Sequence, residues 1–394
     1  MKETGEEELR EFKEILEREF PSLRKTVTRN LSCLIFAFLL LFRTYRGWYG
    51  RLTLSGIARC FPAKGTGRSR YKRLSRFLDN GNFKMVNLTK NLIRLIYPEE
   101  NILPVIIDQT AIGDVQVISA NVPMEGRSVP IAISTFEYRR IETSQNRLEE
   151  KFLTTLSSQL PKGIKILQIA DRGYGKSVLL KNRLKRRELF IIRGRRDVIV
   201  HYEENGKIYR KSIGRLKHSM GKPRRYRGCL YQGKEEIKVD VIVYRERGFK
   251  EPWFLLVPAG EEDILSTEKV VELYRRRMNI EVTFRDFKSH LGVRGLSLKV
   301  RRGERLDRLL GAMVLTYILL LVLGAGEIGK FLRKRIEILR SKPRHGTRKT
   351  LSVLTISLFA ISDTFLLARD NLINTLTECF NWLERERVFM PPSF

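Results

Sequence analysis

Two apolar segments that each lead into an aspartate constrain the fold of this chain more than any other feature. Residues 105–107 read Val-Ile-Ile before Asp108, and residues 164–170 are rich in isoleucine before Asp171 and a Gly-rich turn. Such β-branched runs predict buried strands. Open α/β sheets form their sites at the rim where strands end, so we expect both acids at one rim. The predicted fold class is α/β. A single aspartate at the end of a strand is more often a turn former than part of a site.

The segment 274–288 predicts a helix that carries a third acid among cations. At about 100° per residue, four side chains fall within roughly 60° of one another on one face: Tyr274, Arg277, Glu281 and Lys288. A carboxylate framed by bases suits a site that holds a divalent metal and a phosphate together. A solvated, charge-rich helix is the plainer interpretation. The two upstream aspartates make it the weaker one.

Three motifs in this order resemble a known family: Asp108-Gln109-Thr110, Asp171-Arg172-Gly173-Tyr174-Gly175, and Tyr-x2-Arg-x3-Glu-x6-Lys. The chain resembles the DDE transposases of bacterial insertion sequences, in particular the insertion-sequence-four group named for its Y-R-E-K pattern. The resemblance spans roughly residues 30 to 330. Family members often have Trp after the motif arginine, where this chain has Met278.

The resemblance implies a ribonuclease-H-like core with a β-rich insertion, flanked by helical N-terminal and C-terminal regions. It implies that Asp108, Asp171 and Glu281 are the catalytic, metal-binding triad. Tyr274, Arg277 and Lys288 would contact transposon-end DNA, and we expect Arg172 to contact DNA as well. Three neighbouring carboxylates raise one another's pKa unless cations neutralise them, so we expect two Mg²⁺ or Mn²⁺ ions about 3.5–4 Å apart.

The activity implied is that of a DNA transposase. It would bind transposon ends, cleave phosphodiester bonds in a metal-dependent reaction and transfer the strands by cut-and-paste. Some family members cleave through a DNA hairpin and stack a tryptophan on a flipped base. Trp253 lies 28 residues before Glu281, at a similar distance. Packing in the core is an equally good interpretation of a tryptophan in a strand.

The charge balance favours a polyanionic partner. The chain holds 75 Lys and Arg against 44 Asp and Glu, a formal net charge of +31. Such an excess is costly in self-repulsion without a polyanion. We therefore expect double-stranded DNA as the partner, both transposon ends and target.

Two helices near the N-terminus resemble a helix-turn-helix DNA reader. Apolar spacing predicts them at residues 54–60 and 69–78, with Ser69 as the N-cap of the second. The loop between them is longer than the usual turn. Arg70 and Arg73 are the expected DNA contacts, and a generic basic helix is the alternative.

A β-rich insertion is expected between the second and third acids. They are 110 residues apart, too many for a simple loop, and Asn205-Gly206 is a hairpin signal. Residues 193–227 hold twelve Lys or Arg and three acids. This favours a DNA-binding platform, with a solvated basic hairpin as the alternative.

The expected organisation has five segments: a helical DNA-binding region at 1–102, the first part of the core at 103–187, the β-rich insertion at 188–257, the second part of the core at 258–325, and a helical region at 326–394. The last begins with a basic linker or DNA arm near 341–349 and ends in a helix near 366–387. By resemblance it would pair two protomers in a synaptic homodimer.

Other features narrow the class of protein. The four cysteines are far apart and do not pair with the four histidines, so we expect neither structural zinc nor disulfides. The acidic, polar start predicts no signal peptide. The apolar run 34–42 is too short to span a membrane, and 309–325 is at the lower limit and more typical of a core helix. A cytoplasmic, nucleoid-associated protein is expected.

Three alternatives remain open from the sequence. A two-metal, structure-specific DNA nuclease would share the acids, but would not need the Y-R-K side chains or the insertion. A non-cutting, domesticated DNA-binding protein would share the charge, but would not need all three acids. A membrane protein built on residues 309–325 is the third.

Overall fold

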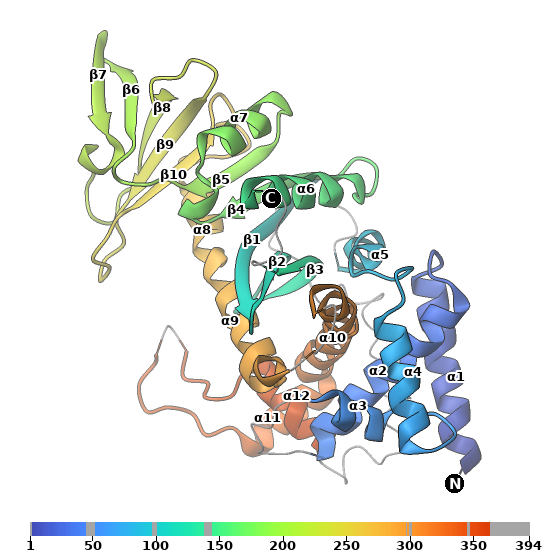
Figure 1. Ribbon diagram of the computed structural model, residues 1–394. Coiled ribbons are helices and arrows are strands. Elements are labelled where there is room, and N and C mark those ends of the chain that lie inside the picture. The colour runs from blue at the N-terminus through green and yellow to red at the C-terminus, as the bar shows by residue number, and fades with distance from the viewer. Residues whose placement is uncertain are drawn as a thin grey trace.

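One mixed sheet of ten strands dominates the part of the chain that the structure describes, residues 2–44, 52–96, 101–137, 144–296, 298, 302–344 and 347–362 of the computed structural model (Figure 1). The strand order is β3-β2-β1-β4-β5-β10-β9-β8-β6-β7. The strands are β1 Ile102–Ile112, β2 Val115–Met124, β3 Arg127–Glu137, β4 Lys165–Ala170, β5 Leu189–Arg193, β6 Ile199–Glu204, β7 Lys207–Ser212, β8 Arg224–Tyr231, β9 Lys238–Tyr244 and β10 Trp253–Pro258. The predicted α/β class is confirmed.

The strands β1, β4 and β5 are parallel and form the centre of the sheet's first half. Residues 103–107 of β1 are all buried, as expected for a central parallel strand covered on both faces. On the other side of β1, the strands β2 and β3 continue the sheet as antiparallel hairpins. Gly113 and Gly126, in the two turns, both have positive φ, which glycine adopts without strain.

The prediction that Asp108 ends a strand is wrong, whereas Asp171 does follow β4 directly. β1 continues to Ile112 because its outer edge pairs with β2, and Asp108 itself lies opposite Ser119. Only the pairing with β4 stops at this level, where Ile107 lies opposite Ala170. The rim that the acids share is therefore the end of β4.

β5 lies within the bounds expected for the β-rich insertion, 188–257, but it pairs parallel with β4 and belongs to the central strands. The remaining strands of the expected insertion extend the same sheet. β10 pairs antiparallel with β5, and β9, β8, β6 and β7 follow outward. The predicted hairpin is confirmed, because β6 and β7 are joined by Asn205 and Gly206, both with positive φ. The insertion forms the arm at the upper left of Figure 1.

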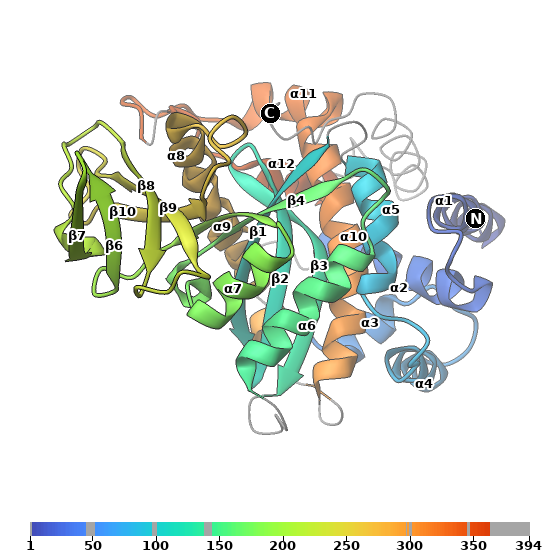
Figure 2. The same cartoon turned by 90° about the horizontal axis from the view of Figure 1, so that it is seen from above.

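Helices cover both faces of the central strands. Along β1, Ile106 packs with residues of α8 and α9, whereas Val105 and Ile107 belong to the larger core that includes α6, α7 and α10. Figure 2 shows these helices around the sheet. The helices are α1 Lys2–Glu19, α2 Lys25–Thr44, α3 Leu54–Cys60, α4 Gly67–Leu78, α5 Val86–Ile96, α6 Gln145–Ser158, α7 Ser177–Lys185, α8 Thr267–Arg275, α9 Asn279–Arg285, α10 Arg302–Ala325, α11 Glu327–Ile336 and α12 Val353–Ser362.

The N-terminal region is helical, as predicted, and α3 has the predicted bounds. The prediction of Ser69 as N-cap is wrong, because α4 begins two residues earlier with Thr66 as its cap. The Thr66 hydroxyl accepts from the Ser69 N–H, and the Ser69 hydroxyl donates back to the Thr66 carbonyl. Ser69 thus lies in the first turn, where this reciprocal pair satisfies an otherwise unpaired N–H.

Two helices are long and apolar enough to cross a membrane by length and composition, Lys25–Arg43 and Gly303–Ala325. The first shows that the apolar run near residue 34 belongs to a longer helix than the run itself indicates. Within the fold, 94% of the second window is buried. A core helix gives this result, and α10 packs on β3 and α12. Among the described residues, no other helix passes this test, and these two are weak candidates.

The loop between α11 and α12 projects from the body of the protein (Figure 1). Its base is closed by Glu337, whose Oε1 accepts from the N–H groups of Thr350 and Leu351 at 2.8 and 3.0 Å. The two ends of the loop that contains the expected basic linker are therefore held together at Glu337. The helix predicted near 366–387 lies outside the described residues.

Candidate functional site

Three parallel strands each place a charged residue at the same level. Asp108 and Asp171 come one residue after the paired Ile107 and Ala170, and Arg193 comes one residue after Ile192, the partner of Ala170 on β5. Alternation puts all three on one face, because Ile106, Ile169 and Ile191 two residues earlier share the core against α8 and α9. Arg193 was missed in the sequence, although this alternation along residues 189–193 is its signal.

The expected regular helix at 274–288 is wrong, because the segment has two irregularities. α8 ends at Arg275, a 3₁₀ turn covers Arg276–Met278, α9 follows, and a π-helical turn covers Asp286–His290. A π turn adds a residue to the helical repeat and rotates everything beyond it. The spacing of 100° per residue, on which the predicted shared face depends, therefore does not hold over the whole segment to Lys288.

The four motif side chains have different surroundings. Tyr274 and Arg277 are buried, Glu281 is exposed and Lys288 is partly buried. Burial and the nearby Arg294 lower the pKa of Lys288. Burial raises the pKa of Tyr274 to about 12, and its buried hydroxyl has no hydrogen-bond partner within the described residues.

Arg277 joins two of the predicted catalytic acids. Its Nη1 lies 3.2 Å from Oδ2 of Asp108, and its Nη2 lies 2.8 Å from Oε1 of Glu281. The side chain of Arg277 is 10% exposed, that of Asp108 24% and that of Glu281 49%. The tertiary structure thus brings β1 and α9 together through one guanidinium.

The three acids interact through their charges. Burial raises the pKa of Asp108 most, the Gln109 N–H and Arg277 lower it, and the charges of Asp171 and Glu281 raise it further. For Arg277, burial lowers the pKa, but Tyr274 and the three carboxylates outweigh burial and raise it overall. Asp108, Asp171 and Glu281 therefore form one electrostatic cluster around Arg277.

The donors of this cluster fit a hard divalent cation. They are carboxylate oxygens, the ligands that Mg²⁺ and Mn²⁺ prefer, and Oδ1 of Asp171 is buried without a hydrogen-bond partner among the described residues. Within the described ranges, however, no group of three His, Cys, Asp or Glu converges closely enough to hold an ion. Arg277 lies between Asp108 and Glu281, where such convergence would occur.

Trp253 lies against the same segment. Its ring is 5.2 Å from that of Tyr274, edge to face, and 5.8 Å from that of Tyr244 across the β9–β10 pair. Phe249, in the preceding loop, lies 6.5 Å away. These contacts favour the packing interpretation of Trp253 and connect it to the Y-R-E-K segment.

A buried carboxylate behind the cluster was missed in the sequence. Oε1 of Glu149, on α6, accepts from Nε2 of Gln109 at 2.7 Å and from Nε2 of Gln145 at 2.9 Å. Gln109 also reaches the buried hydroxyl of Tyr174, at 3.4 Å. Gln109 thus connects β1 to the turn after Asp171. The spacing of residues on α6 could not indicate that Glu149 takes part in this connection.

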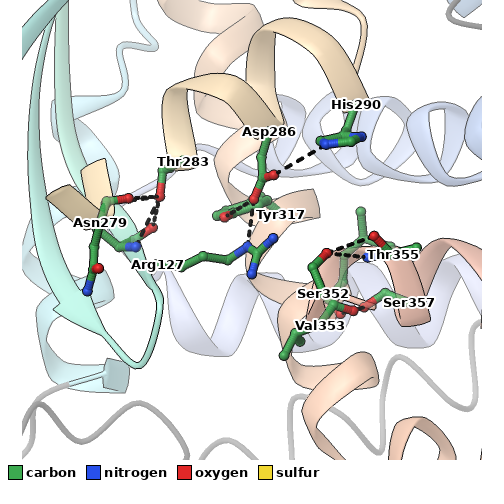
Figure 3. Close-up of polar contacts among 12 residues, drawn as sticks. Arg127, Asn279, Thr283, Asp286, His290, Tyr317, Ser352, Val353, Thr355 and Ser357 are labelled. Atoms are coloured by element: carbon green, nitrogen blue, oxygen red, sulfur yellow. Dashed lines mark hydrogen bonds and ion pairs between the residues drawn. The ribbon is translucent and has the colours of Figure 1, made fainter. Parts of the chain in front are cut away.

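A second buried network holds the far end of the segment (Figure 3). Oδ2 of Asp286 accepts from Nε of Arg127 at 2.6 Å and from the hydroxyl of Tyr317 at 2.9 Å. Thr283 bonds to the backbone of Ser128 at 3.0 and 2.9 Å. The β2–β3 hairpin and α10 therefore fix the position of α9, and with it Glu281.

The other predicted DNA contacts are dispersed. Arg172 is exposed in the turn after Asp171. Arg70 donates to the Arg59 carbonyl, and Arg73 donates to Asn30 at 2.8 Å and stacks on Phe61. Both therefore help to join α4 to α3 and α2. The exposed cations of α4 are Arg68, Lys72 and Arg76.

Comparison with known families adds one match. The model of the transposase DDE domain matches residues 131–319, just under half of the 394-residue chain. The matched part contains Asp171 and Glu281 and begins after Asp108. Among curated proteins, none matches the chain. Residues 131–319 are thus similar to a transposase DDE domain, and this similarity supports a transposase function.

Proposed function

We propose that this protein is a DDE transposase of the Y-R-E-K group that binds transposon ends, cleaves them and transfers the strands by cut-and-paste. The observation that carries the proposal is the electrostatic cluster at the end of β4, in which Arg277 contacts Asp108 and Glu281 and also interacts with the charge of Asp171. The strand order β3-β2-β1-β4-β5, with its two antiparallel and three parallel strands, supports a ribonuclease-H-like core.

Asp108, Asp171 and Glu281 would hold two Mg²⁺ or Mn²⁺ ions. When bound, such ions lower the pKa of an attacking water or 3′-hydroxyl and stabilise the leaving oxygen of a phosphodiester. Asp171, with its buried and unpaired Oδ1, is the best prepared of the three. Burial of Asp108 keeps bulk water from one side of the site, which strengthens its interaction with any cation.

Cations around the acids would bind the DNA backbone. Arg193 is in register with the two aspartates, and Arg172 is exposed beside Asp171. Lys288 follows Glu281 on the segment 274–288. Further out, the β6–β7 hairpin exposes Lys207 and Arg210. The same double-stranded DNA would therefore contact the core and the insertion, and the net charge of +31 favours such a polyanionic partner.

We further propose a synaptic homodimer on two transposon ends, acting in the cytoplasm at the nucleoid. The five segments expected from the sequence would serve as N-terminal DNA-binding region, divided core, insertion and C-terminal pairing region. The projecting loop between α11 and α12 provides a basic arm for DNA or for the second protomer.

The test substitutes each acid with its amide. Asp108→Asn, Asp171→Asn and Glu281→Gln should each reduce Mg²⁺- or Mn²⁺-dependent cleavage of end DNA at least about a thousandfold, because each removes a charged ligand. DNA affinity should stay within about threefold, since many Lys and Arg supply it. Labelled end DNA and a binding assay measure the two. Cleavage that survives in one variant removes that acid from the triad.

A two-metal nuclease is the second candidate, since the acid cluster alone would serve it. The Y-R-K side chains and the basic insertion favour a transposase. Strand transfer decides between them: a transposase joins the freed 3′ end to target DNA, whereas a nuclease releases cut ends only.

A further inference from the structure

We infer that Arg277 is the resident counter-ion of the acidic cluster, and that it must leave its bridge between Asp108 and Glu281 before these acids can hold a divalent cation. The inference rests on the proposed function and assigns Arg277 a role in controlling metal occupancy. The family resemblance had implied a contact with transposon-end DNA for this residue.

The position of Arg277 carries the first step. Its two terminal nitrogens each contact a different carboxylate, at 3.2 and 2.8 Å, and the side chain is only 10% exposed. Arg277 therefore links an acid of β1, Asp108, to an acid of α9, Glu281. In this position, the guanidinium neutralises the two carboxylates that a bound divalent cation would otherwise neutralise.

The remaining carboxylate carries the second step. Oδ1 of Asp171 is buried and has no hydrogen-bond partner among the described residues. The charge of Asp171 nevertheless interacts with that of Arg277 and raises the pKa of Arg277. The guanidinium therefore neutralises the cluster only in part. Charge is left over for a divalent cation, which carries more positive charge into the same place.

The chain supplies a route for Arg277 to move. The residue lies in the 3₁₀ turn between α8 and α9, where the helical hydrogen-bond pattern is interrupted. Met278 beside it is exposed, so the turn faces solvent on one side. When Arg277 leaves the acids, its five donors become available to a DNA phosphate. Metal loading and DNA contact are then coupled through one side chain.

The experiment measures Mn²⁺ binding to the full chain without DNA, by calorimetry and by the decrease of the free Mn²⁺ resonance signal. Arg277→Met keeps an unbranched, flexible side chain, although a shorter one, and removes the guanidinium charge, so Mn²⁺ should bind at least about tenfold more tightly than to the wild type. Arg277→Lys should fall between them, because a point charge does not bridge two carboxylates as a planar fork does.

Arg276→Met is the matched control. Arg276 is the neighbouring residue of the same turn, and its ion pair is with Glu272, at 2.6 Å, away from the three acids. Its Mn²⁺ affinity should equal that of the wild type. Melting curves show that each variant is folded, and the increase in melting temperature on adding Mn²⁺ should be largest for Arg277→Met.

Two results would overturn the inference, and they differ from a failure of the proposed function. If Arg277→Met binds Mn²⁺ no more tightly than Arg276→Met, Arg277 does not compete with the cation. If it binds more weakly, Arg277 positions the ligands. The proposed function itself fails if Asp171→Asn and Glu281→Gln leave Mn²⁺ binding unchanged in both the wild-type and the Arg277→Met backgrounds.

Discussion

At the scale of single residues, the site depends on side chains that the sequence pattern could not orient. Arg277 is the clearest case, because a helical wheel places it beside Glu281 but does not show that Asp108 comes within 3.2 Å of it. Trp253 is another. Its partners Tyr244 and Tyr274 come from β9 and α8, so only the folded chain reveals how much of the ring is used for packing.

Trp253→Ala should lower the free energy of unfolding by about 2–3 kcal/mol, somewhat less than loss of a fully buried indole. Tyr274 loses a packing partner as well, so nicking, hairpin formation and double-strand cleavage should decrease together. Denaturant unfolding and labelled end DNA measure these effects. A loss confined to the hairpin step, with an unchanged melting temperature, would show that the ring contacts a flipped base instead.

Asp307 on α10 provides a prediction about pH. Burial raises its pKa to about 6, although the Met85 N–H, which it accepts at 2.9 Å, lowers it. Between its usual pKa and about 6 the folded state binds more protons than the unfolded state, so this group's contribution to stability falls as pH rises through that window. Above it, the charged carboxylate costs stability.

Asp307→Asn should therefore stabilise the protein relative to the wild type, by nearly nothing at pH 4 and by about 1–3 kcal/mol above pH 7. The amide still accepts from Met85. Melting temperatures of both proteins across this range measure the difference. A difference that does not change with pH would show that Asp307 keeps its usual pKa.

At the scale of secondary-structure elements, the important feature is the irregular helix that carries Glu281. α9 is only seven residues long and follows a 3₁₀ turn, so it cannot hold its own orientation. The ion pair of Asp286 with Arg127, on the β2–β3 hairpin, and the hydroxyl of Tyr317 fix its end. We expect this network to set the distance from Glu281 to the strands.

Asp286→Asn should destabilise the protein by about 3–5 kcal/mol, because it leaves the buried Arg127 without its counter-charge. Cleavage should decrease more than DNA binding, since Glu281 is displaced. Tyr317→Phe is the milder variant and should cost about 1 kcal/mol. Urea unfolding measures both.

The double variant Arg127→Met with Asp286→Leu is the control for charge. It replaces the buried pair with apolar groups, and stability should recover largely. If Asp286→Asn alone leaves stability and cleavage unchanged, the network does not position α9.

At the scale of the whole molecule, a ten-stranded sheet makes the core and the insertion one surface. β5 belongs to the parallel strands and also pairs with β10, so the arm of β6–β9 is a direct extension of the rim that holds the acids. The strands of the insertion, with their excess of basic residues, thus belong to the same sheet as the strands β1 and β4 that position the aspartates.

Lys207→Ala and Arg210→Ala on β7 should each weaken DNA binding about equally for all sequences. Each should also reduce the slope of log K against log salt by about one unit, because a phosphate contact is lost. Arg227→Ala is the control, since its guanidinium is held by Glu262 at 2.8 and 2.9 Å. Equal slopes in all three variants and the wild type would mean that the hairpin does not bind DNA.

The sequence by itself determined the elements that depend on local patterns. α3 has the predicted bounds, Asn205-Gly206 turns the hairpin, and β4 leads directly into Asp171. Period-two and period-3.6 hydrophobicity, together with turn residues, are short-range signals, so each can be read without the rest of the chain.

The tertiary structure alone decided how these elements meet. Whether β1 stops at Asp108 depends on β2, and whether Arg277 faces solvent or Asp108 depends on the packing of α9 on the sheet. Arg193 joins the site through strand register, whereas Glu149 joins it from α6 through its hydrogen bond with Gln109. The π turn that contains Lys288 breaks the regular helical spacing predicted for this segment. These are contacts between segments up to 169 residues apart, such as Arg277 with Asp108, and no local period encodes them.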